Sequence, residues 1–271
     1  MIKRKIIFFI LLLYSLFSLF PFGWMVLSSF KTDLQIFISP WSLPESFNYI
    51  NYINAWIKGN FSRYFINSVY ITLISVMGGV LFSSMAGYAF SRLRSKLSNN
   101  LRQLFLLGLM IPGYVTLIPL FIILKNLGWY DTHLALIIPY IAGSMPINIM
   151  LMYATYQNIP QDIDEAAIID GASPWRVFWM ILMPLTRPTA ITVFILMFIS
   201  VWNEFLNVLI FINNPALKTL QAGLMAFRGQ YQTDYASLFA ALVITIIPIV
   251  IIFIVMQDKI TKGMAAGAIK S

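Results

Sequence analysis

The sequence predicts an all-α integral membrane protein with six transmembrane helices and a cytoplasmic loop of two short helices between helices four and five. Of its 271 residues, 59% are hydrophobic and only 10% are charged. The mean hydropathy of +0.80 lies outside the range of soluble globular domains. Long stretches without charge recur along the whole chain, and basic residues gather at their ends. We expect one membrane domain over residues 1–271.

Six stretches have the roughly 20 apolar residues that a helix needs to cross the hydrocarbon core. Only the fifth carries a charged side chain, Glu204. Their length also argues against a β-barrel, whose strands alternate apolar and polar residues over shorter segments. The expected spans are residues 6–27, 65–90, 104–124, 134–157, 188–211 and 236–256.

The first span has the basic start and apolar centre of a signal peptide, because it follows Lys3, Arg4 and Lys5. Its uncharged run is long enough to span, and no clear cleavage site of small residues follows it. We therefore expect a retained helix, with cleavage as the alternative.

The distribution of Lys and Arg predicts the orientation. An even number of spans puts both termini on one side of the membrane, and that side receives 12 of the 18 basic residues. Cytoplasmic loops carry the excess of Lys and Arg, so we expect a multi-pass protein of the cell membrane with both termini in the cytoplasm. The same distribution accounts for the net charge of +8 without a nucleic-acid partner.

Two site classes are excluded or disfavoured by composition. The chain contains no cysteine, which excludes disulfides, thiolate nucleophiles and cysteine metal sites. His133 stands near Asp131 without a second histidine or a carboxylate cluster, so we interpret it as an interface residue rather than a metal or catalytic ligand.

Residues 158–184 interrupt the apolar pattern between spans four and five. Asn158-Ile159-Pro160 is typical of a helix start, and three carboxylates follow where they favour the positive helix end. Gly171 breaks this helix, because glycine accepts a left-handed conformation. Ser173-Pro174 then combines an N-cap with proline at the first helical position and predicts a second short helix over residues 174–183.

Two interpretations of this segment compete. Trp175, Phe178 and Trp179 suit an amphipathic connector that rests in the lipid headgroups. Carboxylates gain nothing from an anionic leaflet, however, so the acidic start stays unexplained. A protein partner with a basic cleft accounts for both the aromatic and the acidic residues.

The same segment resembles the EAA loop of ABC importer permeases, which docks into the ATPase subunit. Glu-Ala-Ala alone is a weak signal, but the spacing to the glycine, the closing proline and the place between spans four and five make it specific. Met183 stands where the family commonly has leucine, a near-isosteric change. The matching motifs are Glu165-Ala166-Ala167, Asp170-Gly171-Ala172 and Ile181-Leu182-Met183-Pro184.

The resemblance extends over most of the chain and points to the carbohydrate branch. The chain is similar to the smaller, six-span permease subunit of maltose-type importers. The motifs that carry this likeness are Ser29-Phe30-Lys31, Asn67-Ser68, Gly87-Tyr88-Ala89 and Trp202-Asn203-Glu204-Phe205. The resemblance implies a transport subunit, not an enzyme, that forms half of the pathway for a sugar or oligosaccharide. The implied partners are a homologous second permease, two ATPase subunits, an extracytoplasmic solute-binding protein, the sugar and membrane lipid.

The resemblance assigns ATP and Mg to the ATPase partner, and no cofactor is expected here, because the sequence contains no G-x-x-x-x-G-K-[ST] phosphate loop. It implies that Glu165 faces a basic residue of the ATPase and that Gly171 lets the elbow fit its cleft. The residues expected to form the ATPase-coupling site are Glu165, Ala166, Ala167, Asp170, Gly171, Ala172, Ser173, Trp175, Arg176 and Phe178.

Span five holds the candidate substrate contacts. A lone carboxylate inside a membrane helix is costly to leave unpaired, so Glu204 is a functional candidate, with a structural pair or an interfacial position as the alternative. Trp202 suits the apolar face of a sugar and Asn203 its hydroxyl groups. In the outer loop, contacts with the binding protein are expected from Lys218, Gln221, Arg228 and Gln230, the alternative being a solvated connector.

Three other functions are alternatives to sugar import. The same importer type could carry a non-sugar cargo such as glycerol phosphate, although no cationic cluster is evident inside the spans. A secondary transporter would need paired broken helices and more intramembrane ionisable residues than Glu204. A membrane enzyme would need a nucleophile, base and orienting group, and the sequence shows no such set at the membrane face.

Overall fold

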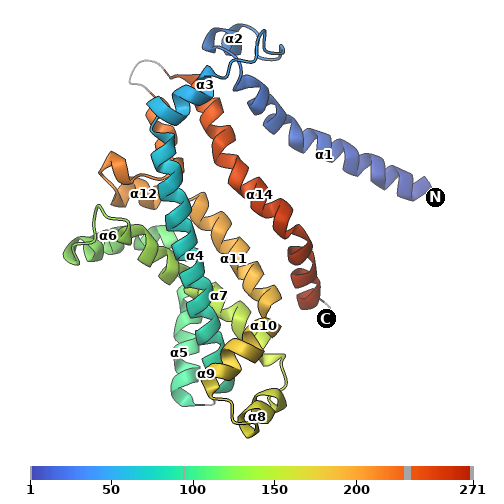
Figure 1. Cartoon of the computed structure of the whole chain (residues 1–271), viewed down its shortest axis with the longest axis vertical. Coiled ribbons are helices and arrows are strands. Elements are labelled where there is room, and N and C mark those ends of the chain that lie inside the picture. Colours follow the sequence, from blue (N-terminus) through green and yellow to red (C-terminus); the bar gives the residue numbers. More distant parts are fainter. Residues whose placement is uncertain (1, 94, 229–232, 269–271) are drawn as a thin grey trace. The chain divides into compact units, whose positions relative to one another are not determined.

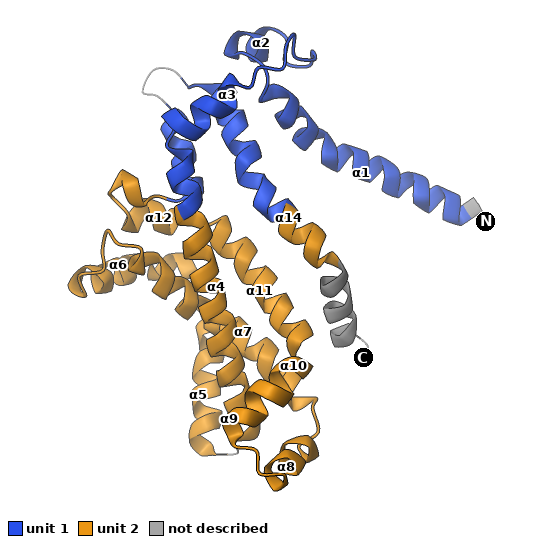
Figure 2. Cartoon of the chain, viewed as in Figure 1, with its two compact units in different colours: residues 1–66, 219–250 blue, residues 67–218, 251–271 orange. Residues whose placement is uncertain are grey.

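The computed structural model describes residues 2–93, 95–228 and 233–268, with side chains from Lys3 to Gln257. Within these ranges the regular structure is helical, apart from one isolated bridge between Arg228 and Thr233. Figure 1 follows the helices along the chain. Backbone contacts group the residues into two compact units, coloured separately in Figure 2. The first comprises residues 1–66 and 219–250, and the second comprises residues 67–218 and 251–271.

The first unit is built on two long apolar helices and short helices between them. The long helices are α1 (Ile2–Ser28) and α14 (Tyr235–Ala268), of which residues 235–250 belong here. Trp24 packs edge-on against Phe239 at 5.2 Å, and the Asp33 carboxylate accepts a hydrogen bond from the Ala236 amide at 2.7 Å. These contacts join the two sequence segments of the unit. The short helices are α2 (Asp33–Ile38), α3 (Ile50–Ile53), η1 (Asn54–Lys58), α13 (Leu220–Gly223) and η6 (Leu224–Phe227).

The second unit is organised around α7 (Leu134–Gln157). This helix contacts α5 (Lys96–Leu107), α11 (Arg187–Trp202) and α12 (Leu206–Phe211). The helix α4 (Phe61–Arg92) packs on α7 through glycine, since a Cβ at Gly87 would lie 2.8 Å from the Met152 Cβ. Small residues at such a crossing let two membrane helices approach closely.

Four expected spans correspond to single long helices. They are α1, α4, α7 and α14, and α7 covers the same residues, 134–157, as the expected fourth span. The last helix runs beyond the expected end of the sixth span at residue 256, because its backbone stays helical to Ala268. The side chains of Lys259 and Lys262 lie outside the described residues.

The third and fifth expected spans are not single helices. The third breaks at Ile111-Pro112, where α5 and η2 (Gly108–Met110) give way to η3 (Gly113–Thr116) and α6 (Leu117–Asn126) with a bend of 98°. Proline removes a backbone donor and disfavours helical geometry in the residue before it, and Ile111 is accordingly extended. The fifth breaks between Trp202 and Leu206, separating α11 from α12.

Candidate functional site

The segment between α7 and α11 folds as two short helices around a glycine elbow, as the sequence predicts. The first is α8 (Asp162–Ile169). Gly171 then adopts φ +82°, and its amide donates to the Ile168 carbonyl at 2.9 Å. A Cβ at Gly171 would meet nothing within 4 Å, so glycine is needed there for its backbone angle rather than for space.

The second helix starts at a side-chain cap. Ser173 Oγ accepts the Arg176 amide at 3.3 Å, and Pro174 occupies the first position of α9 (Pro174–Val177). The chain continues through a π-helical turn, η4 (Phe178–Leu182), and α10 (Met183–Leu185). The helix therefore extends beyond the expected end at Met183, because the turn at Pro184 is still helical. It meets α11 at a bend of 77°.

One face of this segment belongs to the hydrophobic core of the second unit. Phe178 is 2% exposed and contacts the Tyr88 ring of α4 at 5.5 Å. Ala167 of α8 and Leu182 join the same cluster, together with Met152 and Tyr156 of α7. Ala167 and Phe178, which the sequence placed in the ATPase-coupling site, are thus packing residues that hold the segment to the unit.

The opposite face is exposed and mixes acidic with large apolar side chains. Ile169 is 85% exposed and Trp175 is 59% exposed, while Asp162 and Glu165 lie on the exposed surface of α8. Apolar residues exposed together on a structured segment are typical of a surface that binds a protein or a membrane. The other exposed members of the expected ATPase-coupling site are Ala166, Asp170, Gly171, Ser173 and Arg176, and Ala172 is half-buried.

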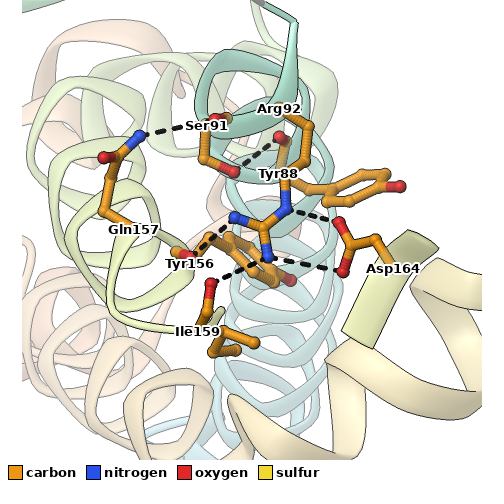
Figure 3. A network of polar contacts seen from close by, with 7 residues as sticks. All are labelled: Tyr88, Ser91, Arg92, Tyr156, Gln157, Ile159 and Asp164. Atoms are coloured by element: carbon orange, nitrogen blue, oxygen red, sulfur yellow. Dashed lines mark hydrogen bonds and ion pairs between the residues drawn. The ribbon is translucent and has the colours of Figure 1, made fainter. Parts of the chain in front are cut away.

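A single arginine fixes the start of this segment to the membrane helices (Figure 3). Arg92, the last residue of α4, donates through Nε to Asp164 Oδ2 at 2.5 Å. Its Nη1 donates to the Tyr156 carbonyl at 3.0 Å and its Nη2 to the Ile159 carbonyl at 3.2 Å. Asp164 is therefore the one carboxylate of the α8 start that points inward.

A second polar site lies where α11 breaks before α12. Glu204 accepts the Asn207 amide at 3.0 Å through Oε1 and the Tyr140 hydroxyl at 2.8 Å through Oε2. The carboxylate thus caps the first turn of α12 and is held to α7. Glu204 thus has the structural partners that the second alternative expects, and it also borders open space.

Two open cavities share Glu204 and Asn207. One has a volume of about 400 Å³ and is lined by Tyr140, Ser144 and Asn148 of α7. The other, of about 550 Å³, lies towards α6 and is mostly apolar. The Asn148 Nδ2 is buried without a hydrogen-bond partner, in a residue that is 1% exposed. Volumes of this size match those of small-molecule sites.

The other two candidate substrate residues lie differently. Trp202 is buried and stacks on Phe198 at 5.5 Å, and it does not line either cavity. Asn203 is exposed, and its Nδ2 donates to the Ile199 carbonyl at 2.9 Å. Of the three expected residues, Glu204 is the one that the structure places at a cavity.

The residues expected to contact the binding protein are divided between the two units. Lys218 belongs to the second unit, and its carbonyl accepts Asn67 Nδ2 at 2.8 Å. Gln221 and Arg228 belong to the first unit, where Arg228 is exposed. Gln230 lies outside the described residues.

His133, which the sequence predicts to be an interface residue, has contacts within the second unit. Its Nε2 lies 2.9 Å from the Leu217 carbonyl, and its ring packs edge-on against Tyr70 at 5.0 Å. Over residues 3–93, 95–228 and 233–257, no group of His, Asp and Glu side chains is arranged to hold a metal ion.

Arg92, Asp164 and Tyr140 were missed as site residues by sequence reasoning. Arg92 was counted among the basic residues at span ends, where one arginine is indistinguishable from the next. Asp164 was counted with the carboxylates of a helix start. Their roles depend on contacts between distant positions. Arg92 and Asp164 are 72 residues apart, and Tyr140 and Glu204 are 64 residues apart.

Long apolar helices, two broken spans beside cavities that share Glu204, and an anchored surface segment are together typical of a membrane transport subunit. The chain belongs to the family of binding-protein-dependent transport system inner membrane components, whose model matches residues 79–266. It is 40% identical to the probable ABC transporter permease YurM of Bacillus subtilis, over 96% of this chain and 86% of that protein. The trehalose/maltose permease MalG of Thermococcus litoralis is 34% identical, over 99% of this chain and 98% of that protein.

Two further comparisons agree. The diacetylchitobiose uptake permease NgcG of Streptomyces coelicolor is 33% identical, over 96% of this chain and 87% of that protein. A chain of a bacterial ABC transporter that imports alginate has the same fold, with a TM-score of 0.83 over 95% of this chain and 96% of that one, at 20% identity. The protein is therefore an inner-membrane permease subunit of a binding-protein-dependent ABC importer, a transport subunit rather than an enzyme.

Proposed function

We propose that this chain forms half of the translocation pathway for a neutral sugar or oligosaccharide. Its relatives include proteins named for transport of diacetylchitobiose, trehalose and maltose, and starch degradation products. The cavity side chains support a neutral cargo over an anion such as glycerol phosphate, because Glu204 is the only charged residue among the described residues that line them. Hydroxyl and amide groups such as those of Ser144 and Asn148 suit sugar hydroxyls.

We infer that the other half of the pathway is a homologous permease, and that two ATPase subunits bind ATP and Mg and supply the energy. The observation that supports ATPase docking is the exposed acidic and apolar face of residues 162–180, which is held on a hydrophobic core. Glu165, Ile169 and Trp175 would contact the ATPase. With this segment in the cytoplasm, both termini are cytoplasmic, and an extracytoplasmic binding protein delivers the sugar on the far side.

The experiment that tests this function is a matched pair of glycine variants. The chain is expressed with its genomic neighbours and purified through a tag on this subunit, and ATP hydrolysis is measured with and without sugar-loaded binding protein. An ATPase should copurify, and sugar should stimulate hydrolysis. Gly171→Asp should abolish stimulation or ATPase association, because it places a side chain where the elbow would enter the ATPase cleft.

Gly128→Asp is the control. Gly128 also has a positive φ, +70°, and open space around its Cα, but it lies between α6 and α7, away from the docking face. Both variants carry the same backbone strain, so only a docking role separates them. Copurification without any ATPase, or equal behaviour of the two variants, would contradict the proposal.

A further inference from the structure

The contacts of Arg92 join three separate helix ends. Its side chain is 12% exposed and that of Asp164 is 11% exposed. The guanidinium reaches the Tyr156 carbonyl in the last turn of α7, the Ile159 carbonyl just beyond it, and the Asp164 carboxylate in the first turn of α8. One side chain at the end of α4 therefore binds both the end of α7 and the start of α8 (Figure 3).

This arrangement requires arginine rather than any cation. Guanidinium presents five donors in a planar fork, and here three nitrogens serve three different acceptor groups. A lysine ammonium is a point charge that cannot span them in the same geometry. The carbonyls at the end of α7 favour a cation through the helix dipole, and Asp164 neutralises the charge that remains.

The three carboxylates at the start of α8 differ in their exposure to solvent. Asp162 and Glu165 are exposed, whereas Asp164 is buried against Arg92. A further link between α4 and α7, from Gln157 Nε2 to the Ser91 carbonyl, is long at 3.4 Å. The Arg92–Asp164 pair is thus the charged connection between the membrane helices and the first helix of the docking segment.

We propose that Arg92 is a positioning residue that transmits movement of α8 to α4 and α7, a role that rests on the proposed ATPase docking. The apolar cluster contains Ala167 of α8 as well as Phe178, so it holds both short helices on the unit, and we expect docking to persist without Arg92. The Arg92–Asp164 joint makes α8 move with the ends of α4 and α7 as one body.

The test uses Arg92→Lys and Asp164→Asn in the complete complex, reconstituted in liposomes. Sugar-loaded binding protein is supplied on the extracytoplasmic side of the complex. The readout is sugar transported per ATP hydrolysed. Both variants should still assemble with the ATPase, and transport per ATP should fall about tenfold, as expected when a coupling contact is weakened. The double variant should be no worse than either single one, because the two residues act as a pair.

Arg187→Lys is the control, since Arg187 is an exposed arginine at the start of α11 in the same unit. It should transport like the parent. If the parent chain couples to an ATPase and the Arg92 and Asp164 variants do so equally well, the positioning role is wrong while the proposed function stands. If both variants fail to assemble, the pair acts in folding and the positioning role is again wrong.

Because the chain has no cysteine, a second experiment tests the joint directly. The Arg92→Cys, Asp164→Cys double variant should transport poorly per ATP. A short bifunctional thiol reagent that links the two positions should restore part of the lost coupling, because it replaces the charged joint by a covalent one. Linking that abolishes residual transport would show that the two positions must separate during transport and would overturn the proposal.

Discussion

The Tyr140 hydroxyl donates a 2.8 Å hydrogen bond to Glu204, joining the second turn of α7 to the point where α11 ends. Tyr140 is buried, and Glu204 also accepts the Asn207 amide that opens α12. The break in the fifth span is therefore stabilised by specific hydrogen bonds to Glu204.

Tyr140→Phe should destabilise this break while leaving the volume of the side chain unchanged. The loss of one hydrogen bond to Glu204 should cost about 1 kcal/mol. The measurement is the thermal unfolding midpoint of the purified complex. Tyr130→Phe is the control, because the Tyr130 ring packs on Phe121 and its hydroxyl has no hydrogen bond to any described residue. Equal midpoints for the two variants would show that the Tyr140 bond adds no stability.

Glu204→Gln should separate capping from cargo contact. The amide oxygen of glutamine can still accept the Asn207 amide, so the complex should assemble. The sugar concentration that half-saturates transport should rise about tenfold, because the carboxylate is a stronger acceptor for sugar hydroxyls than an amide. Transport assays over a range of sugar concentrations measure this. An unchanged half-saturation would restrict Glu204 to its structural role.

Gly87→Ala should disturb the crossing of α4 and α7. The added Cβ would lie 2.8 Å from the Met152 Cβ and 2.9 Å from the Tyr153 backbone nitrogen, too close for either to remain in place. Overpacking of this kind costs about 1–3 kcal/mol. Gly23→Ala is the matched control, because its Cβ would meet nothing within 4 Å. The unfolding midpoint should fall for Gly87→Ala alone, and a fall in both would point to a general loss of glycine flexibility.

Ile169→Ser should weaken association with the ATPase without affecting the fold. Ile169 is 85% exposed, and burial of its side chain in an interface is worth about 1.5–3 kcal/mol, or about tenfold or more in affinity. Titration of the permease complex with purified ATPase measures the change. Ile57→Ser, at a residue that is 67% exposed in the first unit, should bind like the parent. Unchanged binding of Ile169→Ser would place the docking surface elsewhere.

Features set by local sequence were predictable. Hydropathy alone located α7 at residues 134–157, and the Gly171 and Ser173-Pro174 signals located the elbow and the second short helix. These depend on neighbouring residues, because chain length in hydrocarbon, positive φ and helix capping are all local constraints.

Features set by distant partners were not predictable in the same way. Pro112 lies inside the third expected span, and the helix ends there. The stretch between Trp202 and Leu206 contains neither proline nor glycine, and its break is stabilised by Tyr140 from another helix. The roles of Arg92 and Asp164 likewise depend on residues brought together by the fold, which a single sequence does not reveal.

The two interrupted helices of the second unit affect how the chain should behave in the cell when it is made alone. Ile111 and Asn203 leave peptide groups and side chains at exposed positions within apolar segments. Hydrocarbon tolerates such irregular backbone only where protein or water covers it. Under the proposed pairing with a second permease, a copy made without that partner would present this surface to lipid, so we expect quality-control proteases to clear unpaired chains quickly.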